Sequence, residues 1–243
     1  MYNTSGPYNP NSQTSVWDKL SGSTPLTHQG AAAIKQTYFL FGLSVCAALV
    51  GGYIGATSET LARFFSGWIG WIAAMLLLNL VPRIAMSVRD NPQLGVPALL
   101  LDGFVSGIAI SPLLWVARTL APNMIFAALG ITAFVFVGIT LYVMTTSREF
   151  SAPRGLMTGI FFSIIGAVIL NSFLQIGFLG VLIAFGIGMM GVFTLVYATS
   201  SVLRSPDASS PIPGALMLLS GVFNIFVAAL NILLRVFGGG RRN

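Results

Sequence analysis

Seven apolar stretches, each long enough to cross a lipid bilayer as a helix, take up most of this 243-residue chain. A hydrocarbon core about 30 Å thick needs roughly 20 apolar residues in a helix. Only 7% of the residues are Asp, Glu, Lys or Arg, whereas soluble domains contain about 25%. The sequence therefore predicts an all-α membrane protein with no separate soluble domain.

The predicted spans are separated by short polar segments that carry most of the charge. We place the spans at residues 34–56, 65–85, 94–120, 123–145, 154–174, 177–202 and 212–237. Pro112 lies inside the third span and is expected to kink it, because proline lacks the N–H that a helix interior uses. Residues 1–33, rich in Ser, Thr, Asn, Gly and Pro, are predicted to form a disordered tail, and 238–243 a basic C-terminal tail.

The distribution of arginines predicts the orientation in the membrane. The second, fourth and sixth loops and their flanks contain Arg83, Arg89, Arg148, Arg154 and Arg204. The first and third loops contain Arg63 and Arg118. Since cytoplasmic loops carry the excess of Lys and Arg, we expect a cytosolic N-terminal tail and a C-terminus outside, although the arginine-rich C-terminus argues the other way. The net charge of +6 is then loop charge, and we expect no nucleic-acid partner.

Small residues at four-residue spacing indicate where neighbouring backbones approach each other. The faces concerned are Gly51 and Gly55 in the first span, Gly155, Gly159, Ser163 and Ala167 in the fifth, and Gly180, Ala184 and Gly188 in the sixth. The last span has a stripe that consists of Met217, Gly221, Asn224, Ala228, Asn231 and Arg235. Asparagines facing lipid are costly, so we expect this stripe to face protein or water and the last span to be enclosed by the other six.

Asp102 is the one acidic residue inside a predicted span. An ionisable residue within the membrane is a functional-site hypothesis by default, and a buried aspartate would respond to pH. The alternative is an interfacial position near the start of the helix, where the helix dipole favours an anion. Together with Asn171, Ser220, Asn224 and Asn231, Asp102 is our candidate for an ion path or a pH sensor. The second alternative, that the asparagines only join helices, stays open.

The sequence argues against catalysis. Its one histidine, His28, lies in the predicted tail, and its one cysteine, Cys46, lies in an apolar stretch. A metal-dependent enzyme needs clustered ligands, and a di-aspartyl protease needs a second carboxylate within the membrane. We therefore predict no enzyme activity, no metal and no cofactor.

Four segments, in this order, carry a family resemblance: residues 35–40 (KQTYFL), 142–146 (YVMTT), 171–175 (NSFLQ) and 223–227 (FNIFV). With them the chain resembles the Bax inhibitor-1 family, and within it the bacterial YccA-like branch. The resemblance implies a fold in which six helices surround a central seventh, located in the bacterial inner membrane.

The resemblance also implies two functions. Some bacterial members look like pH-sensitive calcium leak proteins that use an aspartate pair on the sixth and seventh spans. Here Ala198 and Gly221 occupy those positions, and neither residue can share a proton or bind calcium. Members of the YccA-like branch look like partners and slow substrates of FtsH, a membrane-anchored AAA+ protease. We predict a non-enzymatic modulator and slow substrate of such a protease, and the alternative is a cation (calcium) leak channel or transporter that uses Asp102.

Overall fold

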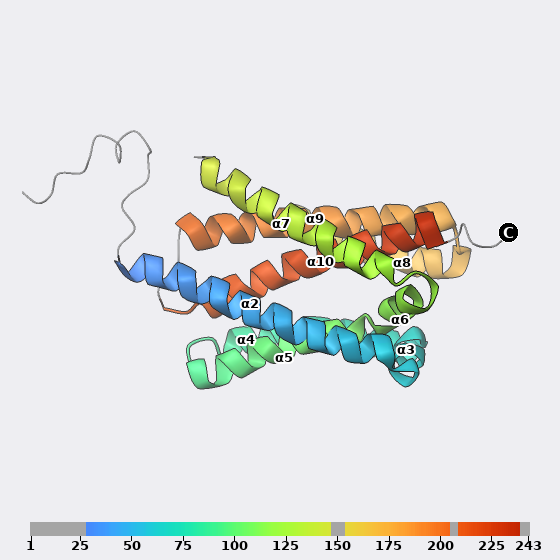
Figure 1. The fold of residues 1–243 in the computed structure, drawn as a ribbon, viewed down its shortest axis with the longest axis horizontal. Helices are drawn as coiled ribbons and strands as arrows, with labels where there is room; N and C mark the ends of the chain where they lie inside the picture. The colour runs from blue at the N-terminus through green and yellow to red at the C-terminus, as the bar shows by residue number, and fades with distance from the viewer. Residues whose placement is uncertain (1–27, 147–153, 205–208, 239–243) are drawn as a thin grey trace, which may run out of the picture.

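A computed structural model describes residues 28–146, 154–204 and 209–238. These residues are all-helical and are arranged as a bundle of long helices (Figure 1). Within the described residues there are nine helices, of which seven are long and apolar enough to cross a membrane. The predicted all-α class with seven candidate spans is confirmed.

The bounds of the helices follow the predicted spans closely, with three departures that are explained below. The helices are α2 His28–Thr57, α3 Glu59–Ser66, α4 Trp68–Ser87, α5 Pro92–Ala109, α6 Ser111–Leu120, α7 Asn123–Thr145, α8 Arg154–Leu174, α9 Gly177–Arg204 and α10 Ile212–Phe237.

The first departure is at the N-terminus, where α2 begins at His28 and not at residue 34. Residues 31–33 are consecutive alanines, and alanine is the strongest helix former, so the helix extends back from the apolar run. Residues 28–33 are therefore helical and not part of a disordered tail. The remainder of the predicted tail, residues 1–27, lies outside the described residues, and so do residues 239–243 of the predicted C-terminal tail.

The second departure is α3, a short helix between the first two spans. Ser58 caps it by accepting a hydrogen bond from the Leu61 N–H at 3.3 Å, and Arg63 pairs with Glu59 one turn earlier. Gly67 then has an extended backbone, and α4 begins at Trp68. Residues 65–66, which we assigned to the second span, therefore belong to α3.

The third departure is in the third span, where the predicted kink is a complete break. Helix α5 ends at Ala109, Ile110 has a non-helical backbone, and α6 starts at Ser111 with Pro112 in its first turn. Pro112 has no N–H for the carbonyl of Ile108, four residues earlier. The hydroxyl of Ser111 donates a hydrogen bond to that carbonyl instead. The pair Ser111–Pro112 thus ends one helix and starts the next.

Helix α10 packs against α2, α4, α5, α6, α7 and α9, whereas α8 packs against α9. Figure 1 shows α10 running between α2 and α9. The main apolar core lies where these helices meet and includes the fully buried Leu99 of α5, Leu195 of α9 and Leu218 of α10. The prediction that the other six spans enclose the last one stays a prediction.

The outer surface of the bundle is strongly apolar. Large side chains such as Phe134 (81% exposed) and Phe173 (80% exposed) point away from the described chain. Exposed apolar patches of this extent are rare on soluble proteins and are typical of surfaces that contact membrane or protein. The surface therefore agrees with helices that face lipid.

The small residues of the fifth span do not make the close contact that we predicted. A side-chain carbon added to Gly155 or Gly159 would meet no atom within 4 Å. With Ser163 and Ala167, these glycines line an open space between α8 and α9. The prediction of a tight interface on this face was wrong. A stripe of small residues allows another helix to approach closely, but it does not ensure that another helix packs there.

Candidate functional site in the helix core

The tightest packing in the core joins α2 to α5. A side-chain carbon on Gly103 would overlap the backbone oxygen of Ser44, and one on Gly51 would overlap that of Phe104. A carbon on Gly107 would lie 2.5 Å from the backbone nitrogen of Gly52. Because backbones meet directly, α5 has a fixed rotation and a fixed height against α2. This contact determines where the side chain of Asp102 lies.

Asp102 is buried, with 6% of its surface exposed. Its carboxylate makes no hydrogen bond and no ion pair with any residue in the described ranges. Since α5 begins at Pro92 with Asn91 as its N-cap, ten residues or about 15 Å of helix separate Asp102 from the helix start. The helix begins two residues before the predicted start of the third span at residue 94, and Pro97 lies inside it. The structure favours a buried Asp102 over an aspartate at the helix end.

Helices α9 and α10 meet at the two positions where the resemblance expected acidic residues. Ala198 is completely buried within the apolar core. Gly221 is buried too, and a side-chain carbon there would lie 3.0 Å from both the backbone nitrogen and the Cβ of Leu195. The absence of a side chain at Gly221 is thus what lets the two helices touch.

The stripe on α10 continues this contact toward the end of the helix. Ala228 lies opposite Gly188, 3.1 Å from where a side-chain carbon on that glycine would be, and the guanidinium of Arg235 lies over Gly180. Gly221, Ala228 and Arg235 of the stripe therefore face α9, which agrees for these three residues with the prediction that the stripe faces protein. The glycines of the sixth span, unlike those of the fifth, are used for packing.

The other candidate residues are spread over the bundle. Asn231 donates a hydrogen bond to the carbonyl of Val227 on its own helix at 3.0 Å. Asn224 is half-buried, Ser220 is exposed, and Asn171 is half-buried on α8 with a buried side-chain oxygen that accepts no hydrogen bond from the described residues. No hydrogen bond connects these residues to one another or to Asp102 within the described chain. The structure thus brings α5 and α10 together but does not join the candidates into one polar network.

Two further buried polar groups lie in this core, and sequence reasoning did not select either of them as a site residue. The Tyr38 hydroxyl and the Thr199 hydroxyl are both buried, and neither has a hydrogen-bond partner in the described residues. Thr199 is next to Ala198 on α9, and Tyr38 packs on the main apolar core. A polar residue close to a glycine or alanine in a span was the available signal, but it is too common in membrane helices to select these two.

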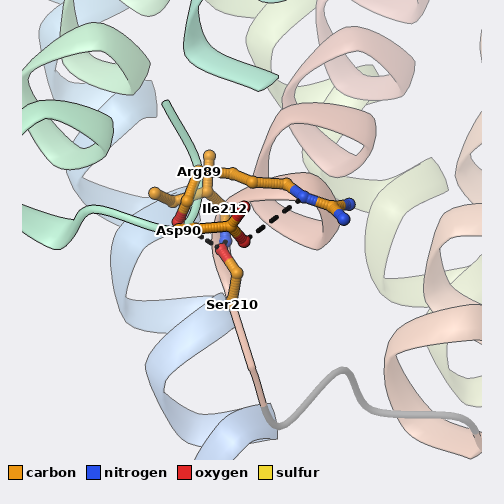
Figure 2. A network of polar contacts seen from close by, with 4 residues as sticks. All are labelled: Arg89, Asp90, Ser210 and Ile212. Atoms are coloured by element: carbon orange, nitrogen blue, oxygen red, sulfur yellow. Dashed lines mark hydrogen bonds and ion pairs between the residues drawn. The ribbon is translucent and has the colours of Figure 1, made fainter. Parts of the chain in front are cut away.

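The start of α10 is tied to the turn between α4 and α5 by a small polar network (Figure 2). The Ser210 hydroxyl donates to the carbonyl of Arg89 at 2.9 Å and accepts from the N–H of Ile212 at 3.4 Å. Arg89 lies 3.6 Å from the carboxylate of Asp90. Close by, Gly95 leaves room for the side chain of Ile212. These contacts hold the ends of α5 and α10 together on the side of the bundle where both helices begin.

Comparison with known proteins identifies the relatives of this chain. A protein of Campylobacter jejuni is 32% identical over 206 residues, which cover 82% of this chain and 87% of that protein. A protein of Pseudomonas aeruginosa is 24% identical over 90% of this chain and 95% of its own length. The modulator of FtsH protease YccA of Escherichia coli K12 is 29% identical over 82% of this chain and 88% of its own length.

The family model "Inhibitor of apoptosis-promoting Bax1" matches residues 30–239, which include every candidate span. The same protein from a second strain of Escherichia coli is named inner membrane protein YccA. This chain therefore belongs to the Bax inhibitor-1 family, and its relatives include bacterial YccA.

Proposed function

We propose that this chain is a non-enzymatic modulator and slow substrate of a membrane-anchored AAA+ protease of the FtsH type. The observation that carries the proposal is the 29% identity to a protein named modulator of FtsH protease, which extends over 88% of that protein. We place the chain in the bacterial inner membrane, with its N-terminus in the cytosol and its C-terminus outside.

The core of the bundle supports an interaction role over the leak mechanism of some family members. At the two positions of the acidic pair the chain has Ala198 and Gly221, both buried between packed helices. Neither side chain can bind a proton or a divalent ion, and the first carbon of a side chain at 221 would lie only 3.0 Å from the backbone nitrogen of Leu195 on α9. We propose that α10 is the central helix of a bundle that serves as a stable scaffold, and that the protease engages the chain from its ends.

Residues 1–27 are the segment through which we expect the protease to engage this chain. An ATP-driven protease needs a polar segment that it can engage on the cytosolic side, and these residues precede α2 and are rich in Ser, Thr, Asn and Pro. Removal of residues 2–27 should lengthen the half-life of the protein several-fold in cells that contain FtsH. Pulse-chase labelling in such cells and in cells depleted of the protease measures this effect.

The matched control replaces residues 2–27 by a shuffled sequence of the same composition. The shuffled chain should be degraded like the native one, because the proposal requires the segment and not its order. Equal half-lives of the truncated and native chains in cells with FtsH would contradict engagement through residues 1–27. Equal half-lives of the native chain with and without the protease would contradict the substrate role.

A second candidate function, a cation leak, is favoured by Asp102. A buried carboxylate without a hydrogen bond or an ion pair in the described chain is costly, and such residues in membrane spans are commonly functional. In this reading Asp102 is the titrating group of an ion path, with Asn171, Ser220, Asn224 and Asn231 as its polar lining.

The test is calcium flux into vesicles that contain the purified protein and a calcium dye, measured across a range of pH. A flux that depends on pH and is abolished by Asp102→Asn would establish the leak. The variant should fold at least as stably as the native chain, since it removes an unpaired buried charge. Absence of flux at every pH leaves the modulator as the function of this chain.

A further inference from the structure

A groove runs along the side of the bundle between α2 and α7, with α10 as its floor. Its volume is about 380 Å³. Leu49 and Gly52 of α2, Leu129 of α7 and Phe223 and Phe226 of α10 line it. In Figure 1 the ribbon of α10 is visible between the ribbons of α2 and α7. The lining is almost entirely apolar, so the groove is suited to a hydrocarbon occupant.

The groove opens toward the surroundings of the bundle. Tyr53 of α2 and Phe126 of α7 both line it, and each is 73% exposed. Both residues belong to candidate membrane spans. A molecule in the surrounding lipid can therefore enter from the side, between the two helices, without passing through water.

The length of the groove matches one leaflet of a bilayer. On α2 the lining extends from Val45 to Thr57, which corresponds to about 18 Å along the helix axis. One leaflet contributes half of a hydrocarbon core that is about 30 Å thick, or about 15 Å. A lipid chain that belongs to this leaflet would lie along the whole groove.

The width of the groove is sufficient for one hydrocarbon chain. Its volume spread over that length gives a mean section of about 21 Å². Apolar atoms in contact lie about 4.0–4.5 Å apart, so one hydrocarbon chain takes a section on the order of 20 Å². The groove therefore has room for one acyl chain.

One end of the groove carries a positive charge that forms no ion pair with the described residues. Arg118, near the end of α6, lines the groove and is exposed. One of its guanidinium nitrogens donates a hydrogen bond to the carbonyl of Ala56 at 3.3 Å. Both ion pairs among the described residues involve other arginines, Arg63 and Arg89. The remaining N–H groups of Arg118 are free to bind an anion, and guanidinium is well suited to phosphate.

We propose that this groove is a binding site for an anionic phospholipid, which places one acyl chain between α2 and α7 and its phosphate on Arg118. The lipid comes from the leaflet on the side of α3 and of the α6–α7 turn. The bound acyl chain fills the gap between α2 and α7 above α10. Lipid binding therefore affects the packing of α10.

The test is native mass spectrometry of the full chain in detergent, titrated with dioleoyl phosphatidylglycerol, dioleoyl phosphatidylcholine or oleate. We expect phosphatidylglycerol to bind at least about 10-fold more tightly than phosphatidylcholine, because the choline cation offsets the charge of the phosphate and repels the guanidinium of Arg118. Equal affinities for the two lipids would overturn the proposal. Oleate binding as tightly as phosphatidylglycerol would also overturn it, since the occupant would then be a free fatty acid.

Substitutions at Arg118 and Gly52 test whether the lipid binds in this groove. Arg118→Gln should lower the affinity for phosphatidylglycerol about 10-fold, and Arg118→Lys should keep most of it, because the charge remains. Gly52→Leu should reduce binding of both phospholipids by filling the groove. In that position a new side chain meets the movable end of Leu114 at 3.3 Å and no backbone atom within 4 Å, so the variant is expected to fold.

Two matched control variants make the same kinds of substitution at positions outside the groove. Arg63→Gln removes an exposed arginine on the same side of the bundle, and Gly42→Leu adds a side chain to α2 at a position with no atom within 4 Å. Both should bind phosphatidylglycerol like the native chain. Native-like binding by Arg118→Gln or by Gly52→Leu would show that the lipid binds elsewhere and would overturn the proposal.

Discussion

Replacing Gly107 by alanine should destabilise this protein by about 3 kcal/mol, at the upper end of the cost of overpacking. The new methyl group would overlap the backbone oxygen of Ala48 and lie 2.5 Å from the backbone nitrogen of Gly52. Backbone atoms cannot move aside as a flexible side chain can, so α2 and α5 would have to separate. Unfolding of the purified protein by increasing SDS in mixed micelles, followed by loss of helical circular dichroism, measures the change.

Gly130→Ala is the matched control for this variant. Gly130 is exposed on α7, and a side-chain carbon there meets no atom within 4 Å. Because alanine favours a helix over glycine by about 1 kcal/mol, this control should be as stable as the native protein or slightly more stable. If Gly107→Ala and Gly130→Ala unfold at the same SDS concentration, the direct backbone contact between α2 and α5 is not what holds them together.

Restoring an acidic residue at the position of the missing pair should cost even more. In Gly221→Asp the first side-chain carbon would lie 3.0 Å from the backbone nitrogen of Leu195, and the carboxylate would be placed between packed apolar helices. The steric term is about 1–3 kcal/mol, and an aspartate inside a membrane adds about 3 kcal/mol on insertion scales. The folded yield and the SDS midpoint should both fall sharply.

Two further variants separate the causes of this loss. Gly221→Ala carries the steric term alone and should show a smaller loss. Ser220→Asp puts the same carboxylate one residue earlier on α10, where the side chain is exposed, and it tests the charge without the collision. A Gly221→Asp protein as stable as the native one would show that α9 and α10 can accommodate the acidic pair, and it would remove the main structural objection to a leak mechanism.

The variants at Gly107 and Gly221 also test function. Gly107 lies in the contact between α2 and α5 that positions Asp102, and Gly221 lies in the contact between α9 and α10. If α2 and α5 separate in Gly107→Ala, the surroundings of Asp102 change while the residue itself is kept. Comparing calcium flux in this variant with that in Asp102→Asn would distinguish an effect of packing from an effect of the carboxylate.

Much of the secondary structure followed from local features of the chain. An apolar run about 20 residues long becomes a helix in a bilayer wherever it occurs, because no water is present to satisfy an open backbone. For this reason the predicted ranges of the fourth, fifth and seventh spans coincide with α7, α8 and α10. The break at Pro112 is equally local, since it depends on a missing N–H and on the neighbouring Ser111 hydroxyl.

The sequence alone therefore determined the number of candidate spans and the family, and it carries Ala198 and Gly221 at the positions where the resemblance implies an acidic pair. The tertiary structure decided which faces meet: that Gly51 of α2, Gly107 of α5 and Gly221 of α10 are contact points, and that the glycines of α8 are not. It also decided that Asp102 is buried without a partner in the described chain and that Arg118 ends a groove. The reason is that lipid is as apolar as leucine, so a membrane helix shows no hydrophobic pattern that separates its inner face from its outer one.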